Sequence, residues 1–424
     1  MQLSIEKRFK RDIQKIARKL KTAASSLSRS TFFAHSDLTE LDLIEFGGFS
    51  VLQRALYPNN DSPAALAHSA LISSHRRKLD LMYGKQVAIS TQITDELKNA
   101  LSQIKWHQHP PIRSRLKSPH TTRRVLSIDI SDNHFGCNID RNEVGTINEY
   151  NWTIAGRRIA LAFSQVLDYK TQYRNETDLV ISINGDNLAG VIHGQEWEVD
   201  LLTTQTVGAL HILVQAISYV ASSFSKIDIY MTPGNHGRMM HKASKDRATA
   251  NKWDSHENIL FHSLALALTP YKNIHSHIPL SPFALYKIFN HNIFQTHGDT
   301  IIKIGNPGKA IKMQDMMHQI NAINSSTLLN GQQIHVAKFG HVHTQTVQLL
   351  SNGCMALING CSSGTDPFAN SIGIFGNSVV QLLHETVPAW PVGDIRFLQL
   401  KSADNDASLD KIIKPFEREM VERK

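Results

Sequence analysis

Two patterns of hydrophobic residues divide the chain. After residue 124, short apolar segments rich in Ile, Val and Leu alternate with longer segments whose apolar residues recur at helical spacing. The pattern predicts strands at 125–130, 179–183, 227–231, 293–295 and 334–339, and helices at 147–173, 196–224 and 254–268. This alternation is typical of an α/β fold, in which helices cover a sheet. We therefore assign residues 122–400 to one large α/β domain.

The amino-terminal residues follow a helical pattern without strands. Residues 3–21 place apolar side chains on one face of a predicted amphipathic helix, namely Ile5, Phe9, Ile13, Ile16, Ala17 and Leu20. Shorter helical segments follow and are interrupted at Ser36 and at Gly47–Gly48. Several short helices after a basic first helix predict a small all-α, helix-turn-helix-like module over residues 1–60.

Charge is distributed unevenly along the chain. The net charge is +8, but residues 1–124 hold 21 Lys and Arg against 10 Asp and Glu, whereas the other 300 residues hold 24 against 27. Residues 61–121 are expected to form a helical and basic linker region, and residues 401–424 a charged tail. The basic first helix permits three interpretations: a solvated helix packed on its neighbours, a nucleic-acid contact, or a helix at a membrane surface.

Composition narrows the class of protein. Hydrophobic residues make up 41% of the chain and charged residues 19%, as in soluble globular proteins. The three cysteines, Cys137, Cys354 and Cys361, are too few and too far apart for a disulfide framework or a cysteine-based zinc module. There is no apolar run of 18 residues and no signal-peptide pattern. We expect a soluble protein in a reducing compartment, without membrane contact.

Polar residues follow all five predicted strands. The five endings are Ser131-Asp132-Asn133-His134, Asn184-Gly185-Asp186-Asn187, Gly234-Asn235-His236, Thr296-His297-Gly298-Asp299 and Gly340-His341-Val342-His343. Ligands of open α/β sheets gather at the carboxyl ends of the strands. One such ending is typical of a helix cap or a core histidine. Five in succession predict side chains that converge on one site.

The residue types at these endings suit divalent cations. A carboxylate shared by two histidine-rich groups can hold two ions about 3.5–4 Å apart. His341 and His343 are two residues apart, so on an extended segment they would project to the same side and serve adjacent ions. Two such ions lower the pKa of a shared water, which yields a bridging hydroxide, and they neutralise the charge of a bound phosphate.

The order Asp-x-His, Gly-Asp, Gly-Asn-His, His and Gly-His-x-His over 125–359 resembles the calcineurin-like metallophosphoesterase superfamily. The resemblance implies a layered β-sandwich flanked by helices, with two divalent ions, Mn²⁺ favoured over Fe or Zn²⁺. It implies seven metal ligands: Asp132, His134 and His343 for one ion, Asn235, His297 and His341 for the other, and Asp186 bridging both. His236 matches the histidine that faces the scissile phosphate. As a general acid it would contribute about 10²–10⁴ in rate.

Two features separate this chain from other branches of the superfamily. Gly237 stands where an acidic residue usually follows Gly-Asn-His. After Gly185-Asp186 the chain lacks the Asp-Arg-Gly of the protein phosphatases, which argues against that branch. Three polar neighbours could support the ligands: Asn187, His193 and Asp299.

Two stretches are similar to phage-encoded metallophosphoesterases that are grouped with DNA-repair exonucleases: Gly234–Arg238 and Asn359–Ala369. Residues 28–35 and 45–49 loosely resemble small amino-terminal modules of phage and mobile-element DNA enzymes. These resemblances imply action on DNA in the cytoplasm of a bacterial or phage-infected cell.

A cationic loop follows Gly-Asn-His and predicts contact with a polyanion through Arg238, Lys242, Lys245, Arg247 and Lys252. The favoured function is hydrolysis of phosphodiester bonds by a metal-dependent DNA nuclease or DNA-processing enzyme. Two alternatives stay open. One is a phosphatase or phosphodiesterase for nucleotides or other small phosphoesters, and the other is a DNA-binding or assembly protein with an inactive metal centre. A protein partner or a homo-oligomer is compatible with the sequence but is not predicted by it.

Overall fold

The computed structural model describes residues 5–21, 24, 27–38, 42–43, 49–56, 123–172, 177–191, 198–238, 252, 254–302, 311–326, 329, 332–371 and 378–418. The chain divides into two compact units, residues 1–95 and residues 96–424. The predicted linker region at 61–121 lies outside the described residues.

The described residues of the amino-terminal unit include three helices: α1 (Ile5–Lys19), α2 (Arg29–Phe33) and α3 (Phe49–Leu56). The apolar face of α1 is buried against the other two helices, because Phe9 lies 4.8 Å from Phe32 and 5.6 Å from Phe49 between ring centroids. Ser28 begins α2 by accepting a hydrogen bond from the backbone N–H of Thr31 at 3.2 Å. The small helical module therefore exists and has its own core.

A six-stranded sheet is the first layer of the large unit. Its order is β13 (Ile395–Gln399), β12 (Val380–Thr386), β1 (Arg124–Ile130), β3 (Thr177–Asn184), β5 (Ile227–Thr232) and β6 (Ile274–His277). β1, β3, β5 and β6 are parallel, with Ile128 beside Ile181 and Ile181 beside Ile229. β12 and β13 are antiparallel to their neighbours.

A five-stranded sheet is the second layer. Its order is β10 (Thr346–Leu349), β11 (Met355–Ile358), β9 (Val336–Phe339), β8 (His291–Thr296) and β7 (Phe283–Ile288). β8, β9 and β11 are parallel, whereas β7 and β10 pair antiparallel at the two edges. The hydrophobic pattern predicted β8 and β9 and missed β7, β10 and β11. β7 alternates between buried and more exposed residues, no residue of β10 is buried, and β11 has only four residues.

The two sheets pack against each other around a shared core. Val125, Val180 and Leu382 of the first sheet pack with residues of the second, among them Ile293, Val336 and Leu357. Lys338 of β9 is buried between the sheets and donates to Asp129 of β1 at 2.7 Å. The unit is thus a layered β-sandwich in which one buried ion pair crosses the apolar core.

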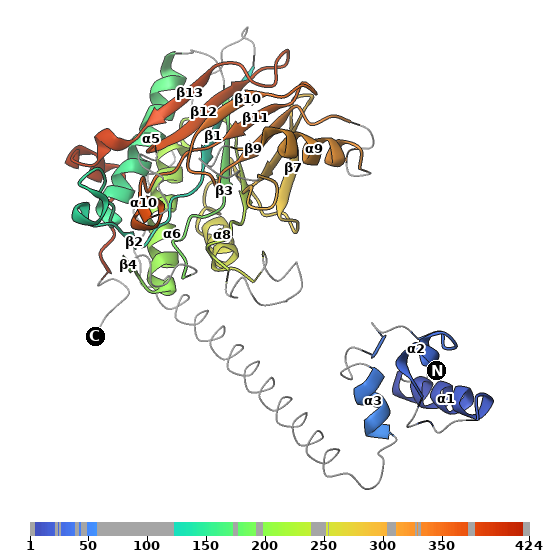
Figure 1. The fold of residues 1–424 in the computed structure, drawn as a ribbon. Coiled ribbons are helices and arrows are strands. Elements are labelled where there is room, and N and C mark those ends of the chain that lie inside the picture. Colours follow the sequence, from blue (N-terminus) through green and yellow to red (C-terminus); the bar gives the residue numbers. More distant parts are fainter. Residues whose placement is uncertain are drawn as a thin grey trace. The chain divides into compact units, whose positions relative to one another are not determined.

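Helices cover the outer faces of the sandwich. In Figure 1, α5 (Trp152–Gln172) and α6 (Leu202–Ala221) lie on the side of the six-stranded sheet, and α9 (Met313–Asn324) lies on the other side. Met316 and Ile320 of α9 pack on Phe339 of β9. The remaining short elements are β2 (Cys137–Asn138), η3 (Arg141–Val144), β4 (Glu198–Val199), α8 (His256–Ala267), α10 (Pro367–Ser371), η5 (Lys401–Ala403) and η6 (Ala407–Lys411). The α/β fold class predicted from the sequence is confirmed.

Two helices begin later than their hydrophobic pattern predicts. α5 starts at Trp152 rather than at residue 147, because the Asn151 side chain accepts the N–H of Ile154 at 3.0 Å and caps the helix. Before it, Asn148 is buried and donates to the backbone of Ser363. α6 starts at Leu202 rather than at 196, because Glu198 and Val199 pair as a short strand.

Residues 401–418 pack on the domain rather than project from it as a tail. Leu409, Ile413 and Phe416 are buried, and Arg157 of α5 binds Asp410 through two hydrogen bonds of 2.8 Å. Apolar residues three and four positions apart give this charged segment a buried side. Residues 419–424 lie outside the described part of the chain.

Two compositional expectations can be compared with the structure. The three cysteines are all buried and free. Within the described residues, no helix is both long and apolar enough to cross a membrane.

Candidate metal centre

The five strand endings converge on one cluster of carboxylates and imidazoles. β1, β3 and β5 contribute the endings of the first sheet, and β8 and β9 those of the second. The centre lies where the carboxyl ends of strands from both sheets meet. Three groups of potential ligand atoms form there, each within 4.8 Å: Asp132, His134 and His343; His134, Asp186 and His236; and Asp186, His297 and His341.

The first group joins β1 to the loop after β9. The Nε2 atoms of His134 and His343 lie 3.0 Å apart, and His343 Nε2 lies 3.4 Å from Asp132 Oδ1. Asp132 and His134 are fully buried. These three side chains are the ones that the sequence pattern assigned to one ion.

A further group, Asp186, His297 and His341, shares Asp186 with the group that contains His134 and His236. His297 Nε2 lies 2.9 Å from Asp186 Oδ2, and the rings of His297 and His341 are 5.2 Å apart. Because Asp186 also groups with His134, its carboxylate lies between the two sets of histidines. That is the position required of a bridging ligand.

Asn235 lies beside Asp186. Its backbone N–H donates to Asp186 Oδ1 at 2.7 Å. Its side-chain Oδ1 is buried and accepts no hydrogen bond from the described residues. A buried amide oxygen without a donor is costly unless another positive group binds it, and a cation would fill that role.

The nitrogen atoms at the centre are arranged for a cation. His297 Nδ1 donates to the backbone oxygen of Asn184 at 2.9 Å, so in the neutral ring Nε2 carries a lone pair and faces Asp186. Burial alone would lower the pKa of His297, but Asp186 and other carboxylates raise it to about 10. Burial and the nearby His297 lower the pKa of His341 to about 4. A neutral imidazole is the form that binds metals, and a metal ion can replace the proton that His297 otherwise holds. The residues present fit a pair of divalent ions.

Backbone strain is concentrated at the same residues. Eight non-glycine residues of the described chain have positive φ, and five of them are predicted ligands: Asp132 (52°), His134 (47°), Asp186 (49°), His341 (73°) and His343 (58°). Each such conformation costs about 1–3 kcal/mol and persists where surrounding structure or function requires it.

This strain corrects one step of the sequence reasoning. His341 and His343 do not lie on an extended segment with a common side, because both have left-handed φ values. The turn instead sends His343 to Asp132 and His341 toward Asp186.

Close backbone approach holds the loops together. Asp186 Oδ1 accepts the N–H groups of Asn235 and His236 at 2.7 and 2.8 Å, and Asp132 accepts the N–H of His341 with both oxygens at 3.1 Å. A Cβ atom at Gly234 would lie 2.1 Å from Asp186 Oδ1. Glycine is therefore required at this position of the Gly-Asn-His turn.

His236 lies beside the centre with one ring nitrogen fixed. Nδ1 donates to the backbone oxygen of Ala189 at 2.9 Å, and Nε2 lies 3.8 Å from Asp186 Oδ2. The ring contacts that of His134 edge-on at 4.6 Å between centroids. His236 thus presents Nε2 to the centre, as a group that contacts a bound phosphate must.

The predicted cationic loop is described at its two ends alone. Arg238 is half-buried and pairs with Ser255 as an isolated bridge. Lys252 is buried, and its ammonium binds Asp299 at 2.7 Å. The expected role of Lys252 as an exposed DNA contact is corrected, because its charge is already neutralised inside the protein. The remaining candidates, Lys242, Lys245 and Arg247, lie outside the described residues, as does His193.

Sequence reasoning missed Glu257, a buried acid that contacts the loops of the centre. Glu257 of α8 is fully buried, and its Oε2 accepts the N–H of Gly234 at 2.6 Å. Its Oε1 accepts the N–H of Asn187 at 2.7 Å. Burial, followed by the charge of Asp186, raises the pKa of Glu257. The missing acid at Gly237 was the signal that could have prompted a search for another carboxylate.

A second missed residue is Arg158 of α5, which is fully buried. Its guanidinium binds Asp404 through bonds of 2.7 and 2.8 Å and donates to the backbone oxygen of Ser362 at 2.7 Å. The N–H of Ser362 in turn donates to the backbone oxygen of Asp132 at 3.1 Å. Arg158 therefore holds the loop on which the Asp132 backbone rests.

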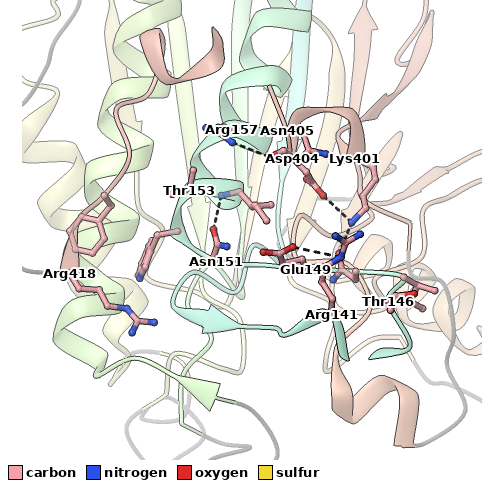
Figure 2. A pocket seen from close by; sticks show the side chains of 15 residues that line it. Arg141, Thr146, Glu149, Asn151, Thr153, Arg157, Lys401, Asp404, Asn405 and Arg418 are labelled. Atoms are coloured by element: carbon pink, nitrogen blue, oxygen red, sulfur yellow. Dashed lines mark hydrogen bonds and ion pairs between the residues drawn. The ribbon is translucent and has the colours of Figure 1, made fainter. Parts of the chain in front are cut away.

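A separate pocket of about 770 Å³ opens between the start of α5 and the segment near residue 401 (Figure 2). Its cations already have partners, since Arg157 binds Asp410 and Lys401 binds Asp404 at 2.9 Å. None of the predicted ligands lines it. The pocket therefore does not compete with the metal centre as the site of chemistry.

Comparisons with known proteins give weak structural likenesses. No protein-family model matches the sequence, and no curated protein does. A predicted phosphoesterase from Streptococcus pneumoniae is 10% identical over 65% of this chain and 98% of its own, with a TM-score of 0.24. A dimetal phosphatase from Danio rerio is 10% identical over 65% and 99%, with a TM-score of 0.29. A 5'-nucleotidase from Candida albicans is 10% identical over 70% and 56%, with a TM-score of 0.31. TM-scores this low do not establish membership of a family. Any statement on function therefore depends on the geometry of the centre.

Proposed function

We propose that this protein is a two-metal phosphoesterase of the calcineurin-like metallophosphoesterase superfamily. The observation that carries the proposal is the convergence of five strand endings into three groups of potential ligands, two of which share Asp186. The buried Oδ1 of Asn235 supports it, because it accepts no hydrogen bond from the described residues and a cation would satisfy it. The layered β-sandwich supports it as well.

The chain's own groups have distinct tasks in hydrolysis. When bound, two divalent ions activate water and neutralise the charge of a phosphate. Asp132 and Asp186 would supply the negative charge that holds such ions, and Asp186, which belongs to two of the three groups, would serve both positions. His236 is fixed through Nδ1, so a proton on Nε2 is directed at the centre and can pass to a departing oxygen.

We infer that the substrate is a phosphodiester bond in DNA and that the protein acts as a nuclease or DNA-processing enzyme, with Mn²⁺ as the favoured ion. The basic first 124 residues support a polyanionic substrate. Arg238, two residues after His236, supplies a further cation near the centre. The resemblance of Gly234–Arg238 and Asn359–Ala369 to phage-encoded DNA-repair exonucleases points to the same substrate.

One assay series tests the function. The full chain with Mn²⁺ is incubated with linear and circular DNA, in single- and double-stranded form, beside a chromogenic phosphodiester and a panel of nucleotides. We expect cleavage of DNA that stops with chelator and in Asp186→Ala. Lys272→Ala, a surface change in the same unit, is the matched control and should retain full activity.

The outcomes separate the three functions that the sequence left open. Cleavage of DNA supports a nuclease. Turnover of nucleotides or small esters without any cleavage of DNA would replace it with a small-molecule phosphoesterase. Two bound ions without hydrolysis of any substrate would indicate a binding or assembly protein with an inactive centre.

A further inference from the structure

The outer face of α1 gathers cations. Lys7, Lys10, Arg11, Lys15 and Arg18 line a shallow groove of about 590 Å³ together with Gln14. All five cationic side chains are exposed. We refer to these five residues as the cationic face of α1.

The spacing of these residues makes one continuous row of charge. Lys7, Arg11, Lys15 and Arg18 follow each other at intervals of three or four residues, so they are neighbours along about 16 Å of helix. Like charges at these intervals destabilise a helix. Arg11 binds Asp12 at 3.0 Å, whereas no ion pair is found for Lys15 or Arg18 within the described residues. A row that is unfavourable by itself becomes favourable when a linear polyanion lies against it.

The structure favours a nucleic-acid backbone over other partners. The opposite face of α1, with Phe9 and Ile13, is buried in the core of the unit and is not available for insertion into a membrane. The groove is lined by cationic and amide side chains alone. It therefore lacks the apolar pocket that would anchor a peptide.

We propose that the cationic face of α1 binds the sugar-phosphate backbone of DNA without reading its base sequence. The inference rests on the proposed function for the identity of the polyanion, and on the structure for the surface. Contacts to phosphate position a protein on DNA and carry no sequence information directly. The face thus holds substrate for a centre that lies in the other unit.

The test removes three charges from the face in the full chain. The variant Arg11→Gln/Lys15→Gln/Arg18→Gln keeps side chains that favour helices. The matched control, Lys272→Gln/Lys287→Gln/Lys411→Gln, removes the same net charge from exposed sites of the large unit. Binding of a labelled 20-base-pair duplex is measured by fluorescence anisotropy at 50–200 mM KCl, with chelator present so that no cleavage occurs. Thermal melting confirms that both variants fold.

The expected result is quantitative. Loss of three phosphate contacts weakens binding by roughly 100-fold near 0.1 M salt and lowers the log–log salt slope by about 2–3. The control should keep the slope of the unmodified protein, and hydrolysis of a small diester should be unchanged in both variants. An unchanged slope in the α1 variant would overturn the proposal. So would binding to anionic lipid vesicles in place of DNA. Failure of the hydrolysis assays would leave this binding measurement intact.

An independent observation concerns Glu257 and the missing acid at Gly237. Position 237 is buried, and a Cβ atom added there would lie 2.7 Å from Cγ of Glu257. A side chain at 237 would therefore enter the space that Glu257 occupies. The N–H of His256 donates to the backbone oxygen of Gly237 at 2.8 Å, which fixes the start of α8 at this point.

The Glu257 carboxylate joins the loops that hold the ligands. Through Gly234 it fixes the turn before Asn235, and through the N–H and side chain of Asn187 it fixes the loop after Asp186. The Asn187 side chain then accepts a hydrogen bond of 2.8 Å from Asn133, between the ligands of β1. One buried carboxylate thus orders three of the five loops.

We infer that Glu257 is a positioning residue that replaces, from the first turn of α8, the acid absent at position 237. The test moves the acidic side chain from position 257 to position 237. Glu257→Ala should weaken Mn²⁺ binding about 10–100-fold, as loss of a group that orients ligands does. Gly237→Glu should also weaken it, because the new side chain meets Glu257. The double variant Gly237→Glu/Glu257→Ala should recover most of the affinity.

Metal affinity measured by titration calorimetry is the readout, so the test does not depend on any substrate. Glu257→Gln keeps the volume of the side chain, and we expect it to fold and to bind Mn²⁺ more weakly, since an amide NH₂ cannot accept both N–H groups. Unmodified affinity in Glu257→Gln would overturn the inference. A double variant no better than the weaker single variant would overturn it as well.

Discussion

The metal centre and the cationic face of α1 handle charge in opposite ways. At the centre the charged groups are buried, and named hydrogen bonds fix individual atoms, as His297 Nδ1 is fixed by Asn184. On α1 the charges are exposed at the ends of long side chains. The difference follows from the tasks proposed for them. Bond cleavage depends on placement within a fraction of an ångström, whereas holding a polyanion depends chiefly on the number of cations near it.

The largest expected effect concerns the donation of a proton by His236 at the centre. In His236→Gln we expect hydrolysis of DNA to fall by about 10²–10⁴, the contribution of a general acid. A chromogenic diester with an acidic leaving group needs little protonation, so its hydrolysis should fall far less. Steady-state rates on both substrates measure this. Equal losses on the two substrates would contradict the role of His236 as a proton donor.

The next effect compares how much a buried arginine and an exposed arginine contribute to the free energy of unfolding. Arg158→Ala removes a fully buried guanidinium together with its hydrogen bonds to Asp404 and to the backbone oxygen of Ser362, and should lower the free energy of unfolding by about 3 kcal/mol. Arg11→Ala, an exposed cation of α1, should change it by less than about 0.5 kcal/mol. Urea denaturation of the full chain gives both values. Similar losses in the two variants would erase the distinction between buried and exposed cations.

Salt should affect the two regions differently. If all five cations of the α1 face contact phosphate, raising KCl from 50 to 200 mM weakens DNA binding by about 500-fold. Hydrolysis of a small diester should change little, because the charges of the centre are buried and poorly screened. Parallel titrations of binding and of turnover check this, and an equal salt dependence would place the binding energy elsewhere.

The smallest effect is a pH dependence of stability. Burial opposes ionisation of Asp404, but hydrogen bonds from Arg158 hold its pKa below the ordinary value. A depressed pKa stabilises the fold above about pH 4, where the unfolded carboxyl is ionised. That stability is lost as pH falls through the folded pKa. In Asp404→Asn the unfolding free energy should therefore fall less steeply between about pH 5 and 3, by less than about 2 kcal/mol in total. Equal slopes would remove Asp404 as the cause.

Features that depend on neighbouring residues along the chain could be predicted from the sequence. Each polar block directly follows an apolar strand along the chain, so local pattern was enough to single out Asp132, Asp186 and Asn235, to which the resemblance then gave the role of ligands. The helical module was predictable for the same reason, from apolar residues repeated along α1.

Contacts between distant segments were not predictable. Glu257 and Gly234 are 23 residues apart, and Arg158 and Asp404 are 246 apart. No local sequence pattern predicts such pairs of contacting residues. Lys252 was misread for the same reason, since its partner Asp299 lies 47 residues away and turns an apparent surface cation into a buried ion pair.

The central claim is that two ions share Asp186, and metal content per chain tests it most directly. After reconstitution with Mn²⁺ and dialysis, elemental analysis should find two ions in the unmodified protein and one in either Asp132→Ala or His297→Ala, because each variant removes a ligand from a different group. Asp186→Ala should retain neither at full affinity. A single ion in the unmodified protein, or two ions retained in both single-group variants, would contradict the account.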